Sequence, residues 1–186
     1  MNAKGNIIAL TRTNVIADFG EERWNSFMAK LTRNDNYFSK MIMSVTIVPV
    51  EKLMIFFDEV CKEFFNNDKA LYLMHGKMGA KAALSPGGPH QSYMLTKDIN
   101  HFVKDILPKI WSIFFDAGVF TSKFENNIIH IKITGLDIKN YDFENLVIGY
   151  NQQAVKMFGR KSVAKRVRSI SAGDDDLYFQ LELQDA

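Results

Sequence analysis

The sequence predicts an α+β protein, with a helical N-terminal part and a C-terminal antiparallel sheet of about four strands. Apolar residues recur at helical spacing through most of the first part, whereas the last third alternates apolar and polar residues as half-buried strands do. One helical segment separates two pairs of strand-like runs, which gives the order ββαββ. We expect a single domain over residues 1–186, with the helical part at about 1–117 and the ββαββ part at about 118–186.

Five segments of the helical part have helical periodicity. Pro49 favours a helix that starts beside it, because a first-turn proline gives up no hydrogen bond. Pro108 lies inside another periodic segment and predicts a kink or two helices that meet there. The predicted helices are Asn6–Phe19, Glu21–Leu31, Val50–Phe65, Lys69–Leu84 and Asp98–Asp116.

The helix predicted at Lys69–Leu84 contains two glycines, Gly76 and Gly79. Each costs roughly 1 kcal/mol relative to alanine. Glycines at such positions suggest that the backbone approaches another helix or a ligand closely. The residues expected to face inward are Leu71, Met74, Met78 and Ala82.

The ββαββ part begins after a helix-breaking motif, Asp116-Ala117-Gly118. Its strand-like runs alternate with period two, so each strand should bury one face and expose the other. The predicted elements are the strands Val119–Phe124 and Ile128–Ile133, a helix around Leu146–Phe158, and the strands Ser162–Ser171 and Leu177–Leu183.

Composition limits the function classes. The chain is 47% hydrophobic and 24% charged, which is ordinary for a globular protein, and its net charge of +2 is too small to indicate nucleic-acid binding. One cysteine excludes an intrachain disulfide and a multi-cysteine zinc site. The N-terminus lacks signal-peptide features, and no apolar run approaches the roughly 20 residues of a membrane span. We expect a cytoplasmic protein with no transmembrane segment.

Four histidines are present, at His75, His90, His101 and His130, and none has a metal-binding spacing. His101 is the most informative because it lies on a predicted helix among apolar residues. A haem requires one axial imidazole in such surroundings. The favoured alternative is a partly exposed histidine near a helix start. His130 lies on an alternating strand and should face solvent.

Aromatic and methionine side chains on the predicted helices form stripes that indicate either a filled core or a pocket for an apolar ligand. Cys61 lies within one stripe, where a small inert hydrophobe is favoured over a reactive or lipidated thiol. The candidate pocket residues are Phe56, Phe57, Val60, Cys61, Met74, Met78, Phe102, Ile106 and Ile110.

A basic cluster precedes and occupies the third strand. On a regular strand Arg166 and Arg168 share a face, which could bind phosphates, an acidic protein or an anionic surface. A solvated sheet face is the favoured alternative, and aromatic residues typical of a single-strand binder are missing. The candidate anion or partner surface is Arg160, Lys161, Lys165, Arg166 and Arg168. No activated nucleophile or acid–base pair can be named, so we expect no enzyme activity.

Several short phrases resemble one known superfamily, which holds the haem nitric-oxide/oxygen-binding domains, the 4-vinyl reductase domains and the TRAPP subunits of Golgi transport. The chain looks closest to an uncharacterised bacterial branch found in myxobacteria and relatives. The phrases are Lys4-Gly5-Asn6-Ile7-Ile8, Phe19-Gly20-Glu21-Glu22, Val48-Pro49-Val50, His75-Gly76-Lys77-Met78-Gly79 and the segment Asp98–Gly118 with Leu107-Pro108-Lys109-Ile110-Trp111.

The resemblance has consequences for cofactors. The haem domains carry a Tyr-x-Ser-x-Arg motif that holds the haem propionates, but the matching region around Ile128–Leu136 contains Ile129, Ile131, Ile133 and Gly135. His101 lies near the position of the proximal histidine, yet without the arginine haem is disfavoured. The zinc cysteines of the 4-vinyl reductase type are missing, so no zinc is expected. Cys61 could correspond to the lipid-modified cysteine of TRAPP subunits.

These observations predict a non-enzymatic ligand-sensing or protein-interaction domain with an apolar pocket. It would work through a small apolar ligand or a protein partner, and we expect a homodimer. Two alternatives remain open: a haem-based sensor of NO or O2 that uses His101, and a structural assembly subunit.

Overall fold

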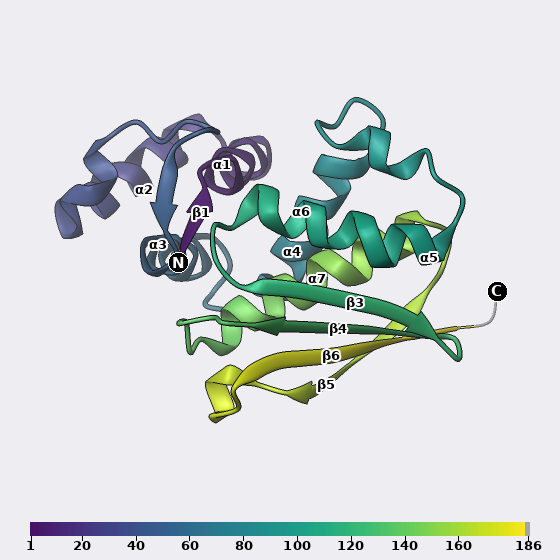
Figure 1. Ribbon diagram of the computed structural model, residues 1–186. Helices are drawn as coiled ribbons and strands as arrows, with labels where there is room; N and C mark the ends of the chain where they lie inside the picture. The colour runs from purple at the N-terminus through teal and green to yellow at the C-terminus, as the bar shows by residue number, and fades with distance from the viewer. Residues whose placement is uncertain (185–186) are drawn as a thin grey trace. The chain divides into compact units, whose positions relative to one another are not determined.

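The computed structural model describes residues 1–184, and the chain divides into two compact units (Figure 1). One unit spans Asn2–Leu71, and the other holds Met1 together with Tyr72 and the chain that follows it. The division falls well before residue 117, because the helices after Leu71 belong with the sheet. The single domain expected from the sequence stays a prediction.

The first unit is built from three helices and a two-stranded ribbon. Strands β1 (Asn2–Lys4) and β2 (Ile47–Pro49) pair antiparallel, with Ala3 opposite Val48. Strands of three residues are too short to show a periodicity, so the sequence did not reveal them. The helices are α1 (Asn6–Phe19), α2 (Glu21–Asn34) and α3 (Val50–Phe64), and a 3₁₀ turn, η1, covers Asn36–Ser39.

Aromatic rings fill the core of this unit. The ring of Phe27 lies 5.3 Å from that of Phe64 and 6.2 Å from that of Phe56, both in edge-on geometry. Such pairs stabilise a core by about 1 kcal/mol beyond the apolar area that they bury. Arg23 covers the cluster, with its guanidinium carbon 5.0 Å from the centre of the Phe64 ring. The aromatic stripe predicted on the third helix is therefore a filled core around Phe56.

The helices of the second unit are less regular. They are α4 (Ala70–Leu84), a 3₁₀ turn η2 (Gln91–Met94), a short α5 (Ile99–His101), a π-helical turn η3 (Phe102–Ile106), α6 (Leu107–Phe114) and α7 (Tyr141–Met157). Pro108 lies in the first turn of α6, where its missing N–H costs nothing. The break predicted at this proline is confirmed, and it has the form of a π-helical turn just before α6.

The sheet contains β3 (Val119–Glu125), β4 (Ile128–Thr134), β5 (Ser162–Arg168) and β6 (Asp176–Leu183), all antiparallel in the order β3-β4-β6-β5. Asn126 and Asn127 join β3 to β4 with positive φ at both positions, as in the hairpin turn that asparagine favours. A 3₁₀ turn, η4 (Ile170–Ala172), lies between β5 and β6. The prediction of an α+β fold with a four-stranded antiparallel sheet is confirmed.

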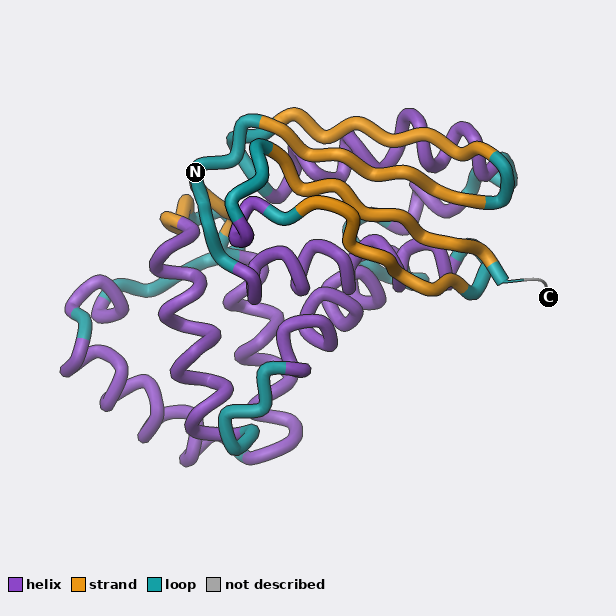
Figure 2. The backbone as a smooth tube through the Cα atoms, turned by 90° about the horizontal axis from the view of Figure 1, so that it is seen from below, coloured by secondary structure: helices purple, strands orange, loops and turns teal. Residues whose placement is uncertain are grey.

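The helices of this unit cover one face of the sheet (Figures 1 and 2). Ile129, Ile131 and Ile133 on β4 expose none of their surface, and neither do the β6 residues opposite them. The other face carries polar side chains, among them His130 and Tyr178. The alternating pattern in the sequence thus reports which face the helices cover.

Helices α4 and α7 touch at two glycines. A Cβ atom on Gly76 would lie 2.0 Å from the carbonyl oxygen of Leu146, and one on Gly149 would lie 2.1 Å from that of Leu73. Only glycine permits this approach. The close approach predicted for Gly76 is confirmed, whereas Gly79 has ordinary spacing, with 3.7 Å to the ring of Tyr150.

This contact rotates the buried face of α4 away from the predicted one. Met74 exposes 54% of its surface and Ala82 is exposed, whereas only Leu71 of the four predicted inward residues is buried. The prediction followed the large apolar residues, but the glycine face is the one that packs. The buried residues of α4 are Leu71, Tyr72, His75, Gly76, Ala80, Ala83 and Leu84.

Candidate functional site

The site centres on His101, the last residue of α5. Asp98 caps this helix, and its carboxylate accepts a hydrogen bond from the backbone N–H of Asn100 at 2.8 Å. Nδ1 of His101 lies 2.9 Å from Oδ2 of Asp105, one turn further along. The histidine side chain is 45% exposed, whereas the next residue, Phe102, is fully buried and stacks on Phe158. The packing of Phe102 therefore fixes the backbone beside the accessible imidazole of His101.

The contact with Asp105 decides which nitrogen of His101 can bind a ligand. A carboxylate only accepts, so Nδ1 is the nitrogen that donates in this hydrogen bond, and in the neutral imidazole the lone pair is then on Nε2. Metal-binding histidines have this arrangement, in which a carboxylate orients the ring and raises its basicity. The π-helical turn that follows is also a feature enriched at functional sites. An i, i+4 pair of histidine and aspartate was visible in the sequence and was overlooked.

The resemblance places a propionate-binding motif on strand β4. The inward side chains of this strand are apolar instead. Ile129, Ile131 and Ile133 are fully buried opposite Leu181, Phe179 and Leu177, which are also fully buried. None of these six side chains can hold a carboxylate. The isoleucines predicted to replace the motif are therefore core residues of the sheet.

The nine predicted pocket residues lie in both units. Phe56, Phe57, Val60 and Cys61 are buried on α3 of the first unit. In the second unit Phe102, Ile106 and Ile110 are buried, Met78 is half-buried and Met74 is exposed. The exposure of Met74 removes it from any enclosed apolar pocket, because the packed face of α4 is the glycine face. Cys61 exposes none of its surface, in keeping with a small core hydrophobe.

The other three histidines have distinct surroundings. Burial lowers the pKa of His75 to about 4, so this side chain is neutral in the folded protein. His90 stacks on Tyr93, and burial also lowers its pKa. Nδ1 of His130 lies 2.7 Å from the hydroxyl of Tyr178 on the polar face of the sheet. Of the four, His101 combines accessibility with a carboxylate partner.

The predicted basic surface is divided by the fold. A β-bulge between Arg166 and Arg168 shifts the register with β6, so Arg166 pairs opposite Phe179 on the helix-covered face and Arg168 opposite Tyr178 on the polar face. Arg168 binds Asp176 there, with 2.6 Å between Nε and Oδ1. The prediction that the two arginines share a face was wrong, because a bulge cannot be read from residue spacing. The remaining members, Arg160, Lys161 and Lys165, are exposed.

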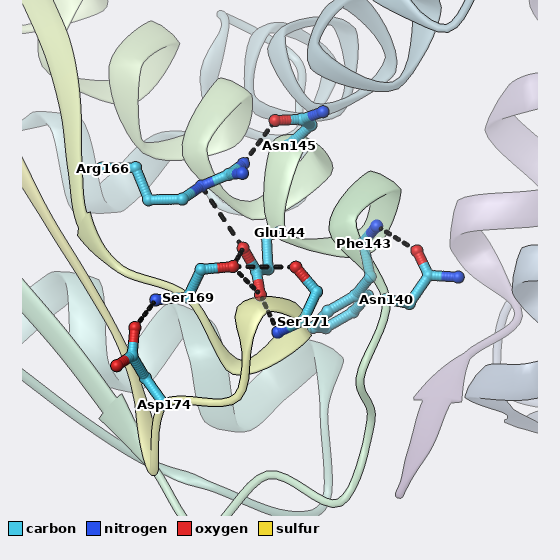
Figure 3. A network of polar contacts seen from close by, with 8 residues as sticks. All are labelled: Asn140, Phe143, Glu144, Asn145, Arg166, Ser169, Ser171 and Asp174. Atoms are coloured by element: carbon cyan, nitrogen blue, oxygen red, sulfur yellow. Dashed lines mark hydrogen bonds and ion pairs between the residues drawn. The ribbon is translucent and has the colours of Figure 1, made fainter.

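A buried carboxylate, which the sequence did not single out, joins α7 to the turn after β5 (Figure 3). Glu144 is 1% exposed and accepts hydrogen bonds from the Ser169 hydroxyl at 2.8 Å and the Ser171 backbone N–H at 2.9 Å. Nε of Arg166 lies 3.3 Å from the same carboxylate. Buried charges need such pairing, and here it anchors the inward-facing arginine.

Two negative findings apply to residues 1–184. No group of three or more histidine, cysteine, aspartate or glutamate side chains is arranged to hold a metal ion. Over the same stretch, none of the helices combines the length and apolar character that crossing a membrane requires.

Solved structures with the same fold include H-NOX proteins. The H-NOX protein of S. oneidensis in the Fe(II)NO ligation state has a TM-score of 0.74 at 16% identity, over 98% of this chain and 99% of that chain. A mutant H-NOX domain from Shewanella oneidensis in the Fe(II)CO state gives 0.76 at 17%, over 98% and 99%. The Fe(II) unliganded H-NOX protein of K. algicida gives 0.69 at 12%, over 98% and 97%. Neither a protein-family model nor a curated protein sequence matches the chain.

These matches establish the H-NOX fold and contradict the prediction that haem is disfavoured. That prediction relied on the missing arginine motif, but the proteins that share the fold hold iron in Fe(II), Fe(II)NO and Fe(II)CO states. The 4-vinyl reductase and TRAPP resemblances and the myxobacterial branch stay predictions.

Proposed function

We propose that this protein is a haem-based sensor of a diatomic gas, and that His101 is the residue that would hold the haem iron. The observation that carries the proposal is the hydrogen bond between His101 Nδ1 and Asp105, which leaves Nε2 as the atom that would bind the iron. The shared fold with H-NOX proteins in iron–NO and iron–CO states supports it. When bound, the haem would supply an iron atom that takes up the gas.

The residues of the site fit a haem only in part. His101 is accessible, and its hydrogen bond to Asp105 would leave Nε2 to hold the iron. The inward side chains of strand β4 cannot bind the haem carboxylates, because they are buried isoleucines. We therefore propose that His101 and apolar contacts would hold the haem, and that the inward side chains of β4 would not bind its carboxylates.

The haem interpretation has more support than the apolar-ligand interpretation, because the solved proteins that share this fold hold iron in Fe(II), Fe(II)NO and Fe(II)CO states. We keep as proposals that the protein is not an enzyme, that it acts in the cytoplasm and that it signals through a protein partner or a homodimer. Native mass spectrometry of the purified protein tests the oligomeric state directly.

Absorbance spectroscopy after haem reconstitution tests the proposal. Purified apoprotein is mixed with haem, freed of excess by gel filtration, reduced, and exposed to NO. We expect a Soret band that co-elutes with the protein and shifts when NO is added. His101→Ala should lose the band, whereas His130→Ala, which removes an imidazole on the polar face of the sheet, should keep it. A wild-type protein without a band, or a His101→Ala variant with an unchanged one, would overturn the proposal.

A further inference from the structure

A groove of about 940 Å³ opens where α7 meets the edge strand β5. Its apolar lining includes Leu73, Ile148 and Val163, and its polar lining includes Lys77 and Arg166. All of these residues belong to the second unit. The groove is open to solvent rather than enclosed, which suits an extended chain better than a small molecule that must be surrounded.

Arg166 lines this groove and is held in place by polar contacts, which Figure 3 shows. Its Nη2 donates to Oδ1 of Asn145 at 2.5 Å, its Nε lies 3.3 Å from Glu144, and its guanidinium carbon lies 4.0 Å from the centre of the Tyr141 ring. The side chain is 17% exposed. A guanidinium held in this way loses little entropy when it binds an anion.

Part of the guanidinium remains available. Among residues 1–184 no acceptor contacts Nη1 of Arg166, so its two N–H groups are unused. Arginine binds carboxylates through two parallel hydrogen bonds when such an edge is accessible. Lys77 adds a second cation to the lining, contributed by α4.

The charged residues that line the groove are of one sign. The residues that line it include Lys77 and Arg166 but no aspartate or glutamate, and Glu144 lies behind Arg166 as its buried partner. Arg160, Lys161 and Lys165, on β5 and in the turn before it, are exposed and add to the positive potential. An anionic occupant is attracted to such a surface and a cationic one is repelled.

We propose that this groove binds an extended acidic segment of a partner protein. One carboxylate of the segment pairs with Arg166 and Lys77, and apolar side chains beside it pack on Leu73, Ile148 and Val163. An edge strand such as β5 also leaves backbone groups that an added chain can use. The proposal does not depend on haem, because the groove is formed by the side chains and backbone of α4, α7 and β5 and does not include His101.

Fluorescence anisotropy tests the proposal with a fluorescein-labelled peptide of alternating glutamate and valine at low ionic strength. We expect saturable binding that salt weakens, and binding at least about tenfold weaker for the matched glutamine–valine peptide. Lys77→Glu should weaken binding by about tenfold, whereas Lys97→Glu, the same charge change at an exposed residue outside the groove, should change it by less than about threefold.

A second variant separates recognition from folding. Arg166→Lys keeps a positive charge next to Glu144 but removes the planar fork, so it should fold and bind the peptide about tenfold more weakly. The proposal is overturned if the peptide does not bind, if Lys97→Glu weakens binding as much as Lys77→Glu, or if Arg166→Lys binds as wild type does. Displacement by free glutarate at the concentration at which the unlabelled peptide competes would also overturn it, in favour of a small-carboxylate site.

Discussion

Nδ1 of His101 and Oδ2 of Asp105 lie 2.9 Å apart across one helical turn. Both side chains are nearly half exposed, so this pair contributes only about 0.5 kcal/mol to the stability of the fold. Its value lies in fixing the proton on Nδ1 and presenting Nε2 outward.

Replacing the carboxylate tests this role. In Asp105→Asn the side-chain amide can donate as well as accept a hydrogen bond, so it cannot enforce one tautomer of His101. We predict haem affinity lower by about tenfold or more, with an apoprotein melting temperature within a few degrees of wild type. The measurement is the rate of haem transfer to an excess of a haem-scavenging protein. The role assigned to Asp105 is excluded if haem transfers from the variant and wild type at the same rate.

The contact between α4 and α7 predicts opposite effects for two glycines on one helix. Gly76→Ala places a Cβ 2.0 Å from the backbone oxygen of Leu146, so the helices must separate, and we expect a loss of about 3 kcal/mol. Gly79→Ala places a Cβ in ordinary contact with Tyr150 and should be neutral or stabilise the protein by up to about 1 kcal/mol. Urea unfolding followed by circular dichroism measures both. Equal effects of the two substitutions would show that the close approach is wrong.

The buried carboxylate of Glu144 gives a third prediction. Glu144→Ala leaves the Ser171 backbone N–H without its acceptor and Arg166 without its charge partner. Breaking a buried pair in this way costs about 3 kcal/mol or more. Glu182→Ala, at an exposed residue of β6, should change the free energy of unfolding by about 0.5 kcal/mol or less. The denaturant midpoints of the two variants measure this difference. Similar midpoints would contradict the stabilising role assigned to the contacts of Glu144.

The titration of His75 should make the free energy of unfolding depend on pH. Burial lowers its pKa from 6.5 to about 4, so between these values the unfolded chain binds more protons than the folded one. Its contribution is complete above pH 6.5 and is lost as the pH falls toward 4, up to about 3 kcal/mol.

Asp176 behaves differently, because the hydrogen bond from Arg168 holds its pKa below the usual range, and its contribution is lost at lower pH than that of His75. Urea midpoints measured from pH 6.5 down to about 4 should therefore fall in wild type and fall less in His75→Gln. Parallel curves for the two proteins would show that His75 is not buried in its neutral form.

Periodicity in the sequence was sufficient to locate the main helices and the four strands of the sheet. It failed where the packed residue is small or the ladder is irregular. On α4 the large side chain of Met74 suggested an inward face, but Gly76 determines it, because backbone contact with α7 requires the absence of a side chain. On β5 a single bulge reversed the relation between Arg166 and Arg168.

The candidate site was recoverable only in part. His101 stood out among four histidines, and the spacing to Asp105 could have identified its partner. The buried isoleucines of β4 were seen correctly, but the absence of a motif was given too much weight against haem. Arg166 was grouped with exposed cations, because no pattern in the sequence reveals that Glu144 is buried beneath it.

Rescue of a cavity variant by free imidazole tests the central claim most directly. His101→Gly costs about 1 kcal/mol of helix stability and removes the proposed ligand while leaving space for imidazole. We predict that reconstituted wild type has a Soret band, that the variant lacks it, and that added imidazole restores it in a saturable manner. A band in the variant without imidazole, or no band in wild type, would contradict the assignment of His101 as the haem ligand.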